Sequence, residues 1–463
     1  MTLDRREARR SMKGTRMNRK FLVRWGAAAA AFSLLAACSS SSKGSGAPSA
    51  TATGSPAPST STSTSASAPA STSTSASAPP SSTAASTAAS TAADPFATPN
   101  KATGTPITVG VLGLEIGPVT FPNYRQAVDA TIQYINDYKG GVGGHPLKLV
   151  HCETDGQPST SQRCANQILD SKPTFIVGGA DTGSSGAYPV WQRAGLAVVG
   201  GVPFTPVEQS YANGVVFAGI SGPDNAAGVT YAQQQGAKSG TVVYTSDTQG
   251  TDVGKRVQSA MNKLGMGPIS MVPVPPTAAD VSTQAATVVS AGRDLVYITT
   301  PVGCASMLKS LHQLGYKGKV YVIDPCTDPR VIAAAGAGAE NMTWGGPIDP
   351  PNSSPDSTLY MQILNKYTPN VAITTITEIG VHTIMNIQSV LSPIADNLTT
   401  ATIMAAFKKG TNNPNFAAHP YTCDGQQLPN APADCNGYQH IFNYSNGKIT
   451  TIGDWVNPSP AMS

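Results

Sequence analysis

The sequence predicts an α/β protein of two lobes, each built on a parallel sheet with helices on both faces. Short apolar runs alternate with helical stretches, which is typical of βαβ units. The alternation stops near Pro223 and then begins again at a similar size. The roughly 350 residues from Ile107 to Val456 also exceed what one hydrophobic core usually organises, so two lobes are expected.

The first series is expected to hold four strands and three helices. A helix that packs on a sheet carries its apolar side chains on one face. In the first expected helix, Val128, Ile132 and Ile135 share one face at helical spacing. The expected strands are 107–112, 147–151, 175–177 and 196–199. The expected helices are 124–138, 160–169 and one from about Ser184.

The second series repeats this rhythm, and both series together predict Rossmann-like lobes. The expected strands are 241–244, 269–272, 295–298 and 320–323, and the expected helices are 225–235, 252–263, 281–290 and 306–314. Residues 345–347 are expected to be a return crossing, followed by helices 357–367, 377–391 and 400–408. Residues 438–444 and 448–452 predict a hairpin, because Asn446-Gly447 is a favoured two-residue turn.

The first 38 residues predict a lipoprotein signal peptide. A basic start precedes an apolar run at 25–35 that is too short for a permanent bilayer span. The run ends in Leu35-Ala-Ala-Cys38, which looks like a bacterial lipobox, so Cys38 is expected to carry a lipid. An ordinary secretory signal that ends in Cys is the alternative. Either Met1 or Met17 fits as the start of translation.

Residues 39–104 are predicted to be a disordered tether. Ser, Thr, Ala and Pro dominate residues 39–94, where Lys43 and Asp94 are the only charged side chains. Such a composition buries too little apolar surface to offset chain entropy. A stalk that holds the folded part away from a membrane fits this composition, with or without O-linked sugar.

Charge argues against a nucleic-acid partner. Residues 95–463 hold 20 Lys and Arg against 23 Asp and Glu, so the folded part carries a net charge near −3 and offers no basic face. Large single-sign surfaces of the kind that bind DNA or RNA are therefore not expected.

Cysteines predict disulfides in an exported chain. Of seven cysteines, six remain once Cys38 is lipidated, and an even number favours bonds over free thiols. Pairing of neighbours gives Cys152–Cys164, Cys304–Cys326 and Cys423–Cys435. A metal site is the alternative, but no Cys-x-x-Cys spacing occurs. No metal and no cofactor are therefore predicted.

The turn Asp181-Thr182-Gly183-Ser184-Ser185-Gly186 is the strongest candidate binding site. It follows a strand and precedes a helix, where backbone N–H groups and hydroxyls suit a carboxylate or another anion. Simple capping of the helix would use the same residues. Asp181-Thr-Gly also spells an aspartic-protease motif, but that chemistry needs a second carboxylate and the chain has no second motif. No catalytic residue and no enzymatic activity are predicted.

Three segments carry a distinctive pattern: Asn136-Asp-Tyr-Lys-Gly-Gly-Val-Gly-Gly-His-Pro-Leu147, His151-Cys-Glu-Thr-Asp155, and Ile176-Val-Gly-Gly179 leading into Ser184-Ser185. Together they resemble type I periplasmic binding proteins of the branched-chain amino acid class. The resemblance covers roughly Thr105 to Asp454. It implies two lobes joined by a three-crossing hinge that closes on a ligand. The first lobe would comprise 105–223 and 347–410, and the second 224–346 and 411–456.

The resemblance also assigns ligand-binding residues. In the first lobe, Thr182, Gly183, Ser184 and Ser185 would hold a ligand carboxylate, and Phe204 would form a second wall of the same pocket. Phe121 in the first loop is expected near that wall, or simply at the surface.

In the second lobe the sequence departs from the amino-acid pattern. Gln249 and Pro301 occupy loops in which the family has aromatic residues. Cys326 aligns with the acid that pairs with a ligand ammonium, and Asp324 stands two residues earlier. Either Asp324 takes that role or the ligand is not an ordinary α-amino acid, because an unpaired buried ammonium is costly.

Together with the lipobox, the resemblance implies a substrate-binding lipoprotein of an ABC importer on the outer face of the cytoplasmic membrane. The ligand would be a small amino-acid-like molecule, organic anion or zwitterion. The protein would be a monomer, with the permease and its ATPase as separate partners and the lipid anchor as its only membrane contact. The alternative is a ligand-sensing domain of the same fold that signals to a membrane receptor or kinase.

Overall fold

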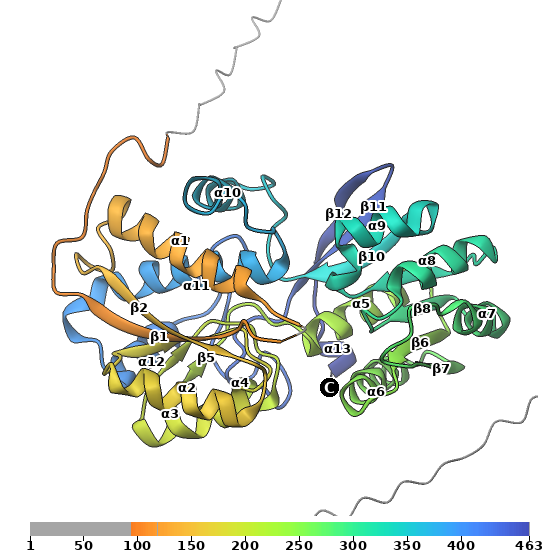
Figure 1. Cartoon of the computed structure of the whole chain (residues 1–463), viewed down its shortest axis with the longest axis horizontal. Helices are drawn as coiled ribbons and strands as arrows, with labels where there is room; N and C mark the ends of the chain where they lie inside the picture. Colours follow the sequence, from red (N-terminus) through yellow and green to blue (C-terminus); the bar gives the residue numbers. More distant parts are fainter. Residues whose placement is uncertain (1–93, 118, 463) are drawn as a thin grey trace, which may run out of the picture. The chain divides into compact units, whose positions relative to one another are not determined.

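The structure of this chain is a computed structural model that describes residues 94–117 and 119–462 (Figure 1). The predicted signal peptide, the lipidation site Cys38 and most of the predicted tether lie outside the described residues. Within the described part of the chain, no helix has both the length and the apolar character needed to cross a membrane.

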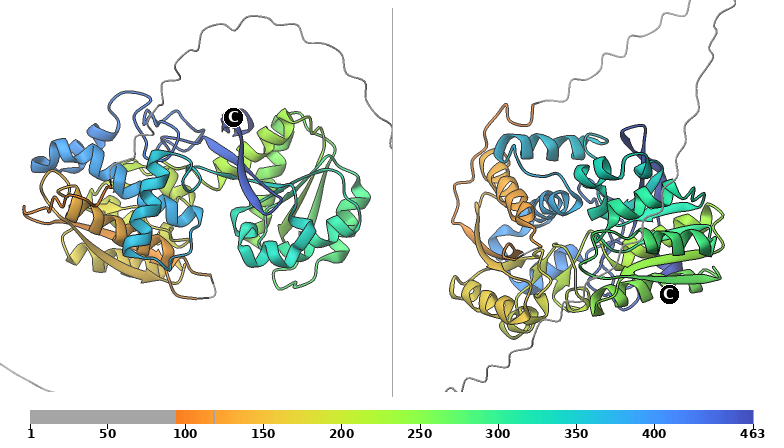
Figure 2. Two further views of the ribbon diagram at one scale, coloured as in Figure 1. Left: turned by 90° about the horizontal axis from the view of Figure 1, so that it is seen from above. Right: turned by 45° about the vertical axis from the view of Figure 1, so that its right-hand side comes forward.

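The first sheet has five parallel strands in the order β2-β1-β3-β4-β5. They are β1 (Ile107–Leu114), β2 (Leu147–Thr154), β3 (Phe175–Val177), β4 (Val198–Val199) and β5 (Gly214–Val215). Helices α1 (Pro122–Tyr138) and α11 (Thr375–Leu391) cover one face, and α2 (Pro158–Asp170) and α3 (Tyr188–Ala194) cover the other (Figures 1 and 2). The short α4 (Pro206–Gln209), α10 (Pro355–Tyr367) and α12 (Thr400–Phe407) complete this lobe.

The second sheet has seven strands in the order β12-β11-β10-β9-β8-β6-β7. The parallel strands are β6 (Gly240–Thr245), β7 (Ile269–Val274), β8 (Leu295–Ile298), β9 (Lys319–Val322) and β10 (Met342–Gly346). The antiparallel hairpin is β11 (Gln439–Ser445) with β12 (Lys448–Val456). Helices α5 (Gly222–Gln234) and α6 (Thr248–Lys263) pack on one face, and α7 (Ser282–Ala291) and α8 (Cys304–Gln313) on the other. The short α9 (Pro329–Ala335) follows η2, and α13 (Ser459–Met462) packs against α5 and α6.

The predicted fold class is confirmed: two mostly parallel α/β sheets are flanked by helices. The chain passes between them three times, before α5, after β10 and before β11. The stretch 345–347 was expected to be only a crossing, but its first two residues end β10, which pairs with β9 and β11. Met342 and Trp344 of this strand are buried in the core of the second lobe.

The segment 413–435 packs on the first lobe, although the sequence analysis assigned 411–456 to the second. Tyr421, Cys423 and Cys435 belong to the same core as Phe217. The segment also exchanges backbone hydrogen bonds with Val216, from Val216 N to the Ala433 carbonyl (2.8 Å) and from Cys435 N to the Val216 carbonyl (2.8 Å). This backbone pairing extends the edge of the first sheet.

The end of the predicted tether is also part of the folded body. Asn100 and Ala102 donate backbone hydrogen bonds to carbonyls at the end of α1 (2.9 and 2.8 Å), and Gly104 donates to Gly144 (2.8 Å). We call residues 94–106 the strap. It fixes the point from which the rest of the N-terminal segment departs.

All three predicted disulfides are present. Cys152 of β2 is bonded to Cys164 of α2, Cys304 of α8 to Cys326, and Cys423 to Cys435. Cys326 lies in the 3-10 turn η2 (Asp324–Thr327) that follows β9. The second bond therefore ties that turn to the start of α8.

Candidate functional site

The residues predicted to bind ligand all follow the carboxyl ends of parallel strands. In open α/β sheets this edge is where ligands bind, because helix starts and loop side chains converge there. Residues 182–185 follow β3, Phe204 follows β4, Gln249 follows β6, Pro301 follows β8 and Asp324 follows β9.

Asp181 organises the candidate turn in the first lobe. Its carboxylate is buried, and it accepts hydrogen bonds from the hydroxyls of Thr154 (2.7 Å) and Ser161 (2.5 Å) and from the backbone N–H of Gly183 (3.1 Å). These donors come from β2, α2 and the turn itself. Asp181 therefore holds the turn in place.

Ser184 faces inward as well. Its buried hydroxyl lies 2.7 Å from the hydroxyl of Thr205, and Thr205 donates to the carboxylate of Glu208 from both its backbone N–H (2.6 Å) and its hydroxyl (2.9 Å). Burial raises the pKa of Glu208 to about 8. This pair was not predicted, although Thr205-x-x-Glu208 is a capping-box pattern visible in the sequence.

Thr182 and Ser185 keep hydroxyls that are free. Neither hydroxyl has a hydrogen-bond partner within the described residues; Thr182 is half-buried and Ser185 is exposed. Gly156 leaves room for Thr182, because a Cβ at Gly156 would lie 2.6 Å from the Thr182 hydroxyl oxygen. Of the four predicted turn residues, these two have side chains available to a ligand.

Phe121 and Phe204 meet at the same edge of the sheet. Their rings stack with centroids 5.5 Å apart and planes 24° from parallel, and both side chains are partly buried. One ring precedes α1 and the other follows β4. Phe121 is therefore no isolated surface aromatic, and the two rings together form one apolar wall.

Two of the candidate residues in the second lobe, Gln249 and Pro301, have side chains that no hydrogen bond to the described part of the chain holds in place. Gln249 is exposed in the first turn of α6, whose N-cap Asp247 accepts a hydrogen bond from Gly250 N (2.6 Å). Pro301 is exposed in the loop before α8. Neither side chain makes a hydrogen bond to another described residue.

Asp324 is the acid present at the end of β9. It is partly buried and its carboxylate accepts a hydrogen bond from the Thr375 hydroxyl (3.0 Å), while burial raises its pKa. Cys326, which aligns with the family's acid, is buried and disulfide-bonded to Cys304, so it has no thiol to ionise. Thr375 comes from α11 of the first lobe, a contact that no local sequence pattern signals.

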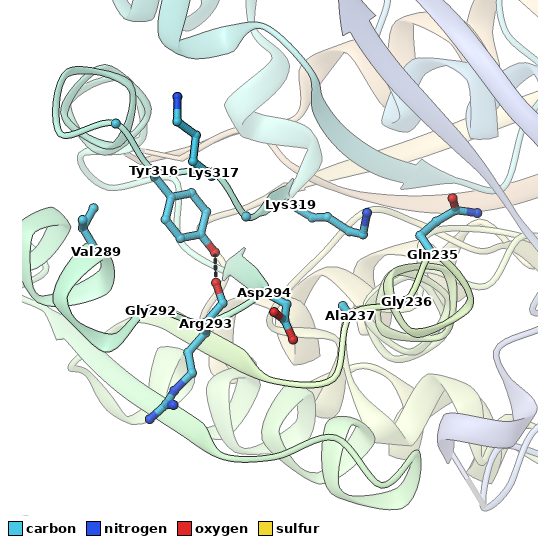
Figure 3. A pocket seen from close by; sticks show the side chains of 12 residues that line it. Gln235, Gly236, Ala237, Val289, Gly292, Arg293, Asp294, Tyr316, Lys317 and Lys319 are labelled. Carbon is cyan, nitrogen blue, oxygen red and sulfur yellow. Dashed lines mark hydrogen bonds between the residues drawn. The ribbon is translucent and has the colours of Figure 1, made fainter.

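A cavity of about 500 Å³ lies elsewhere on the second lobe, at the amino ends of β6, β8 and β9 (Figure 3). Its one acid, Asp294, accepts hydrogen bonds from Lys238 N (2.9 Å) and from the N–H and hydroxyl of Ser239 (both 3.0 Å). Arg293 and Lys317 point away from the centre of the cavity (Figure 3). This opposite edge of the sheet holds none of the predicted binding residues, and we assign no ligand to it.

In the described residues, no group of three or more His, Cys, Asp or Glu side chains is placed to hold a metal ion.

Comparison with known proteins identifies the family. A family profile described as periplasmic binding protein matches residues 106–431. No curated protein sequence matches significantly.

Solved structures agree in fold. A leucine-binding protein of Thermotoga maritima is 18% identical with a TM-score of 0.60, and the match covers 77% of this chain and 99% of that one. An ABC transporter substrate-binding protein of Sphaerobacter thermophilus is 14% identical with a TM-score of 0.64, covering 76% and 98%. A fatty acid ABC transporter substrate-binding protein of Thermomonospora curvata is 16% identical with a TM-score of 0.62, covering 78% and 95%.

The chain belongs to the periplasmic binding protein family, and its fold is that of the type I, leucine-binding class. This family binds small solutes and works with ABC transporters, and its fold is one of binding proteins rather than enzymes. An extracytoplasmic location is consistent with that membership.

Proposed function

We propose that this chain is the extracytoplasmic substrate-binding lipoprotein of an ABC importer, anchored through Cys38 to the outer face of the cytoplasmic membrane. It captures a small amino-acid-like molecule, organic anion or zwitterion between its lobes. It acts as a monomer and delivers this ligand to a permease driven by a separate ATPase.

The observation that carries this proposal is the position of the candidate residues in a chain of this family. Each follows the carboxyl end of a parallel strand, in one sheet or the other. Closure of two such edges on a ligand would exclude water and strengthen every polar contact inside.

The first-lobe turn suits the negative end of a ligand. The free hydroxyls of Thr182 and Ser185 donate to a carboxylate, and the stacked rings of Phe121 and Phe204 supply an apolar surface beside it. Asp324 is the group available to a positive end, provided that the ligand displaces Thr375 from it.

A thermal-shift screen tests the ligand class. Amino acids, amides, polyamines and small organic acids are each added to the purified chain. A ligand at 100 times its Kd stabilises the fold by about 2.7 kcal/mol, which shifts the melting temperature by a few degrees. A shift given only by compounds without a carboxylate or another anionic group would contradict the proposed ligand class.

Replacement of Thr182 by Val tests the turn. Loss of one hydrogen bond to a charged ligand is expected to weaken binding about tenfold, measured by calorimetry with the compound that the screen identifies. Thr287→Val is the matched control, because Thr287 is an exposed threonine of α7. Equal affinities of the two variants would place the ligand elsewhere.

Replacement of Cys38 by Ala tests the anchor. Without the thiol no lipid can be attached, so the protein is expected to move from the membrane fraction to the medium or periplasm. Fractionation and immunoblotting measure this. Cys38→Ala protein that stays in the membrane fraction would disprove the lipid anchor without bearing on ligand binding.

A further inference from the structure

A hydrogen bond joins the two lobes at the carboxyl ends of their strands. The Thr375 hydroxyl donates to the Asp324 carboxylate over 3.0 Å. Asp324 opens η2, directly after β9 of the second sheet, whereas Thr375 is the first residue of α11, which packs along α1 in the first lobe. Parting of the lobes would break this bond and bring Asp324 into water.

The ionisable groups around this bond are mainly acids. The charge of Asp324 acts on Glu378 of α11 and on Asp224 of α5, and Asp349 also acts on Glu378. Their hydrogen-bond partners are Tyr360 for Glu378 (3.1 Å), Tyr321 for Asp224 (3.1 Å) and His440 for Asp349 (3.0 Å). In the described part of the chain, no lysine or arginine forms an ion pair with any of these four acids.

Burial raises the pKa of three of these acids. It raises the pKa of Glu378 to about 8, that of Asp224 to about 7, and also that of Asp324, while the charge of Asp324 raises the first two further. Asp349 differs: burial acts to raise its pKa, but hydrogen bonds from His440 and Ser354 lower it overall.

His382 does not neutralise this group above weakly acidic pH. Burial lowers the pKa of His382 to about 4, so His382 is neutral over the range in which the acids titrate. His440 pairs with Asp349, which follows β10 at a crossing between the lobes. Negative charge that develops on Asp324 and Glu378 therefore has hydroxyl donors as its partners, not a cation.

We propose that the Asp324–Thr375 contact is a proton-controlled latch: the lobes hold together while Asp324 and Glu378 are protonated and part as these acids ionise. The two carboxyl groups belong to different lobes, so their ionisation places like charges on both sides of the contact. The latch operates in the empty protein and does not depend on the identity of a ligand.

Linkage gives the direction. In water an acid titrates near pH 4, so separation of the lobes lowers the pKa of the two carboxyl groups and releases protons. A transition that releases protons is favoured by higher pH. The Thr375 hydroxyl opposes this effect, since it stabilises the charged form of Asp324, but burial outweighs it.

Pulsed EPR distance measurement on the full chain tests the latch. Spin labels are attached to cysteines introduced at two exposed positions, Arg163→Cys on α2 and Lys309→Cys on α8, with Cys38→Ser to leave no other free thiol. Between about pH 5.5 and about pH 8.5 the population at the longer distance is expected to rise at least about threefold. An unchanged distance distribution over this range would overturn the proposal.

Five variants show which groups cause the pH response. Asp324→Asn and Glu378→Gln keep hydrogen-bonding atoms but cannot ionise, so each is expected to reduce the pH response, while Thr375→Val should favour the open form at low pH. Asp396→Asn is the control, because that acid's side chain is fully exposed, and it should respond as the parent does. A full response in both acid variants, or a response abolished only by His440→Gln, would overturn the proposal. Near-ultraviolet circular dichroism at each pH confirms that the variants compared are folded.

Discussion

At the scale of one residue, burial of the Asp434 carboxyl group without a partner in the described part of the chain makes the stability of the fold depend on pH. It is fully buried inside the loop closed by Cys423–Cys435, and neither carboxylate oxygen has a hydrogen-bond partner among the described residues. Burial raises its pKa to about 8. The folded state therefore binds this proton more tightly than the unfolded chain does.

Asp434→Asn is expected to flatten part of the dependence of stability on pH. A raised acid pKa stabilises the fold fully below the unfolded value near 4, and the stabilisation is lost as pH rises through the folded value near 8, by up to about 1.4 kcal/mol per pH unit. Urea unfolding at about pH 6 and pH 8.5 measures this difference. Asp424→Asn in the same loop is the control, since Asp424 is exposed and a hydrogen bond from Gln427 lowers its pKa. An unchanged pH dependence of stability in Asp434→Asn would show that Asp434 ionises as readily in the folded protein as in the unfolded chain.

At the scale of an element, the strap packs against two helices of the first lobe. The Phe96 ring packs edge-on against Tyr134 and Tyr138 (centroids 5.6 and 5.2 Å), and the Lys366 ammonium lies 4.2 Å from the Phe96 centroid while it donates to the Tyr138 hydroxyl (2.9 Å). These contacts link the strap to α1 and to α10.

Phe96→Ala is expected to destabilise the domain by about 2 kcal/mol, because a partly buried ring and its aromatic and cation–π contacts are lost. Thermal unfolding should show a melting temperature a few degrees lower. Val119→Ala is the control, because Val119 is 60% exposed. An unchanged melting temperature for Phe96→Ala would mean that the strap adds nothing to the fold.

The length of a helix or strand decides whether its sequence pattern predicts it. Long helices such as α1 and α11 carry enough apolar positions for their period to show, and the expected bounds of 124–138 and 377–391 fall within two residues of the structure. Strand β5 has two residues, too few for any period to appear, and it was not predicted. Strand β10 was interpreted as a crossing because Gly345-Gly346-Pro347 is typical of a turn; in the fold, a Cβ at Gly346 would lie 2.7 Å from the Phe442 ring, so the glycine admits that ring against the strand.

At the candidate site, the sequence predicts which loops face the edge but not how their side chains pair. Ser184 meets Thr205 across 21 residues and Asp324 meets Thr375 across 51, and only the fold brings such distant positions together. Thr182 and Ser184 looked equivalent in the sequence. The fold separates them, because one hydroxyl is free and the other is buried against Thr205.

At the scale of the whole molecule, buried ionisable groups set an expected stability profile. The pKa values of Glu208, Glu378 and Asp434 rise to about 8 and that of Asp224 to about 7, in each case mainly by burial, while burial lowers the pKa of His382 to about 4. Below the unfolded histidine value near 6.5, protonation of His382 in the unfolded chain works against the acids. Above that pH the histidine is neutral in both states, so the acids act alone.

The free energy of unfolding is therefore expected to fall as pH rises from about 6.5 to about 8.5, the range in which the folded acids lose protons that the unfolded chain has already released. Most proteins are instead near their greatest stability in this range. Urea unfolding at constant ionic strength measures the profile. Opening of the Asp324–Thr375 latch is measured separately by the spin-label distances, whereas the loss of stability moves the midpoint of urea unfolding. A free energy of unfolding that stays level or rises over this range would mean that water reaches these carboxyl groups in the folded state, and would remove the electrostatic basis of both effects together.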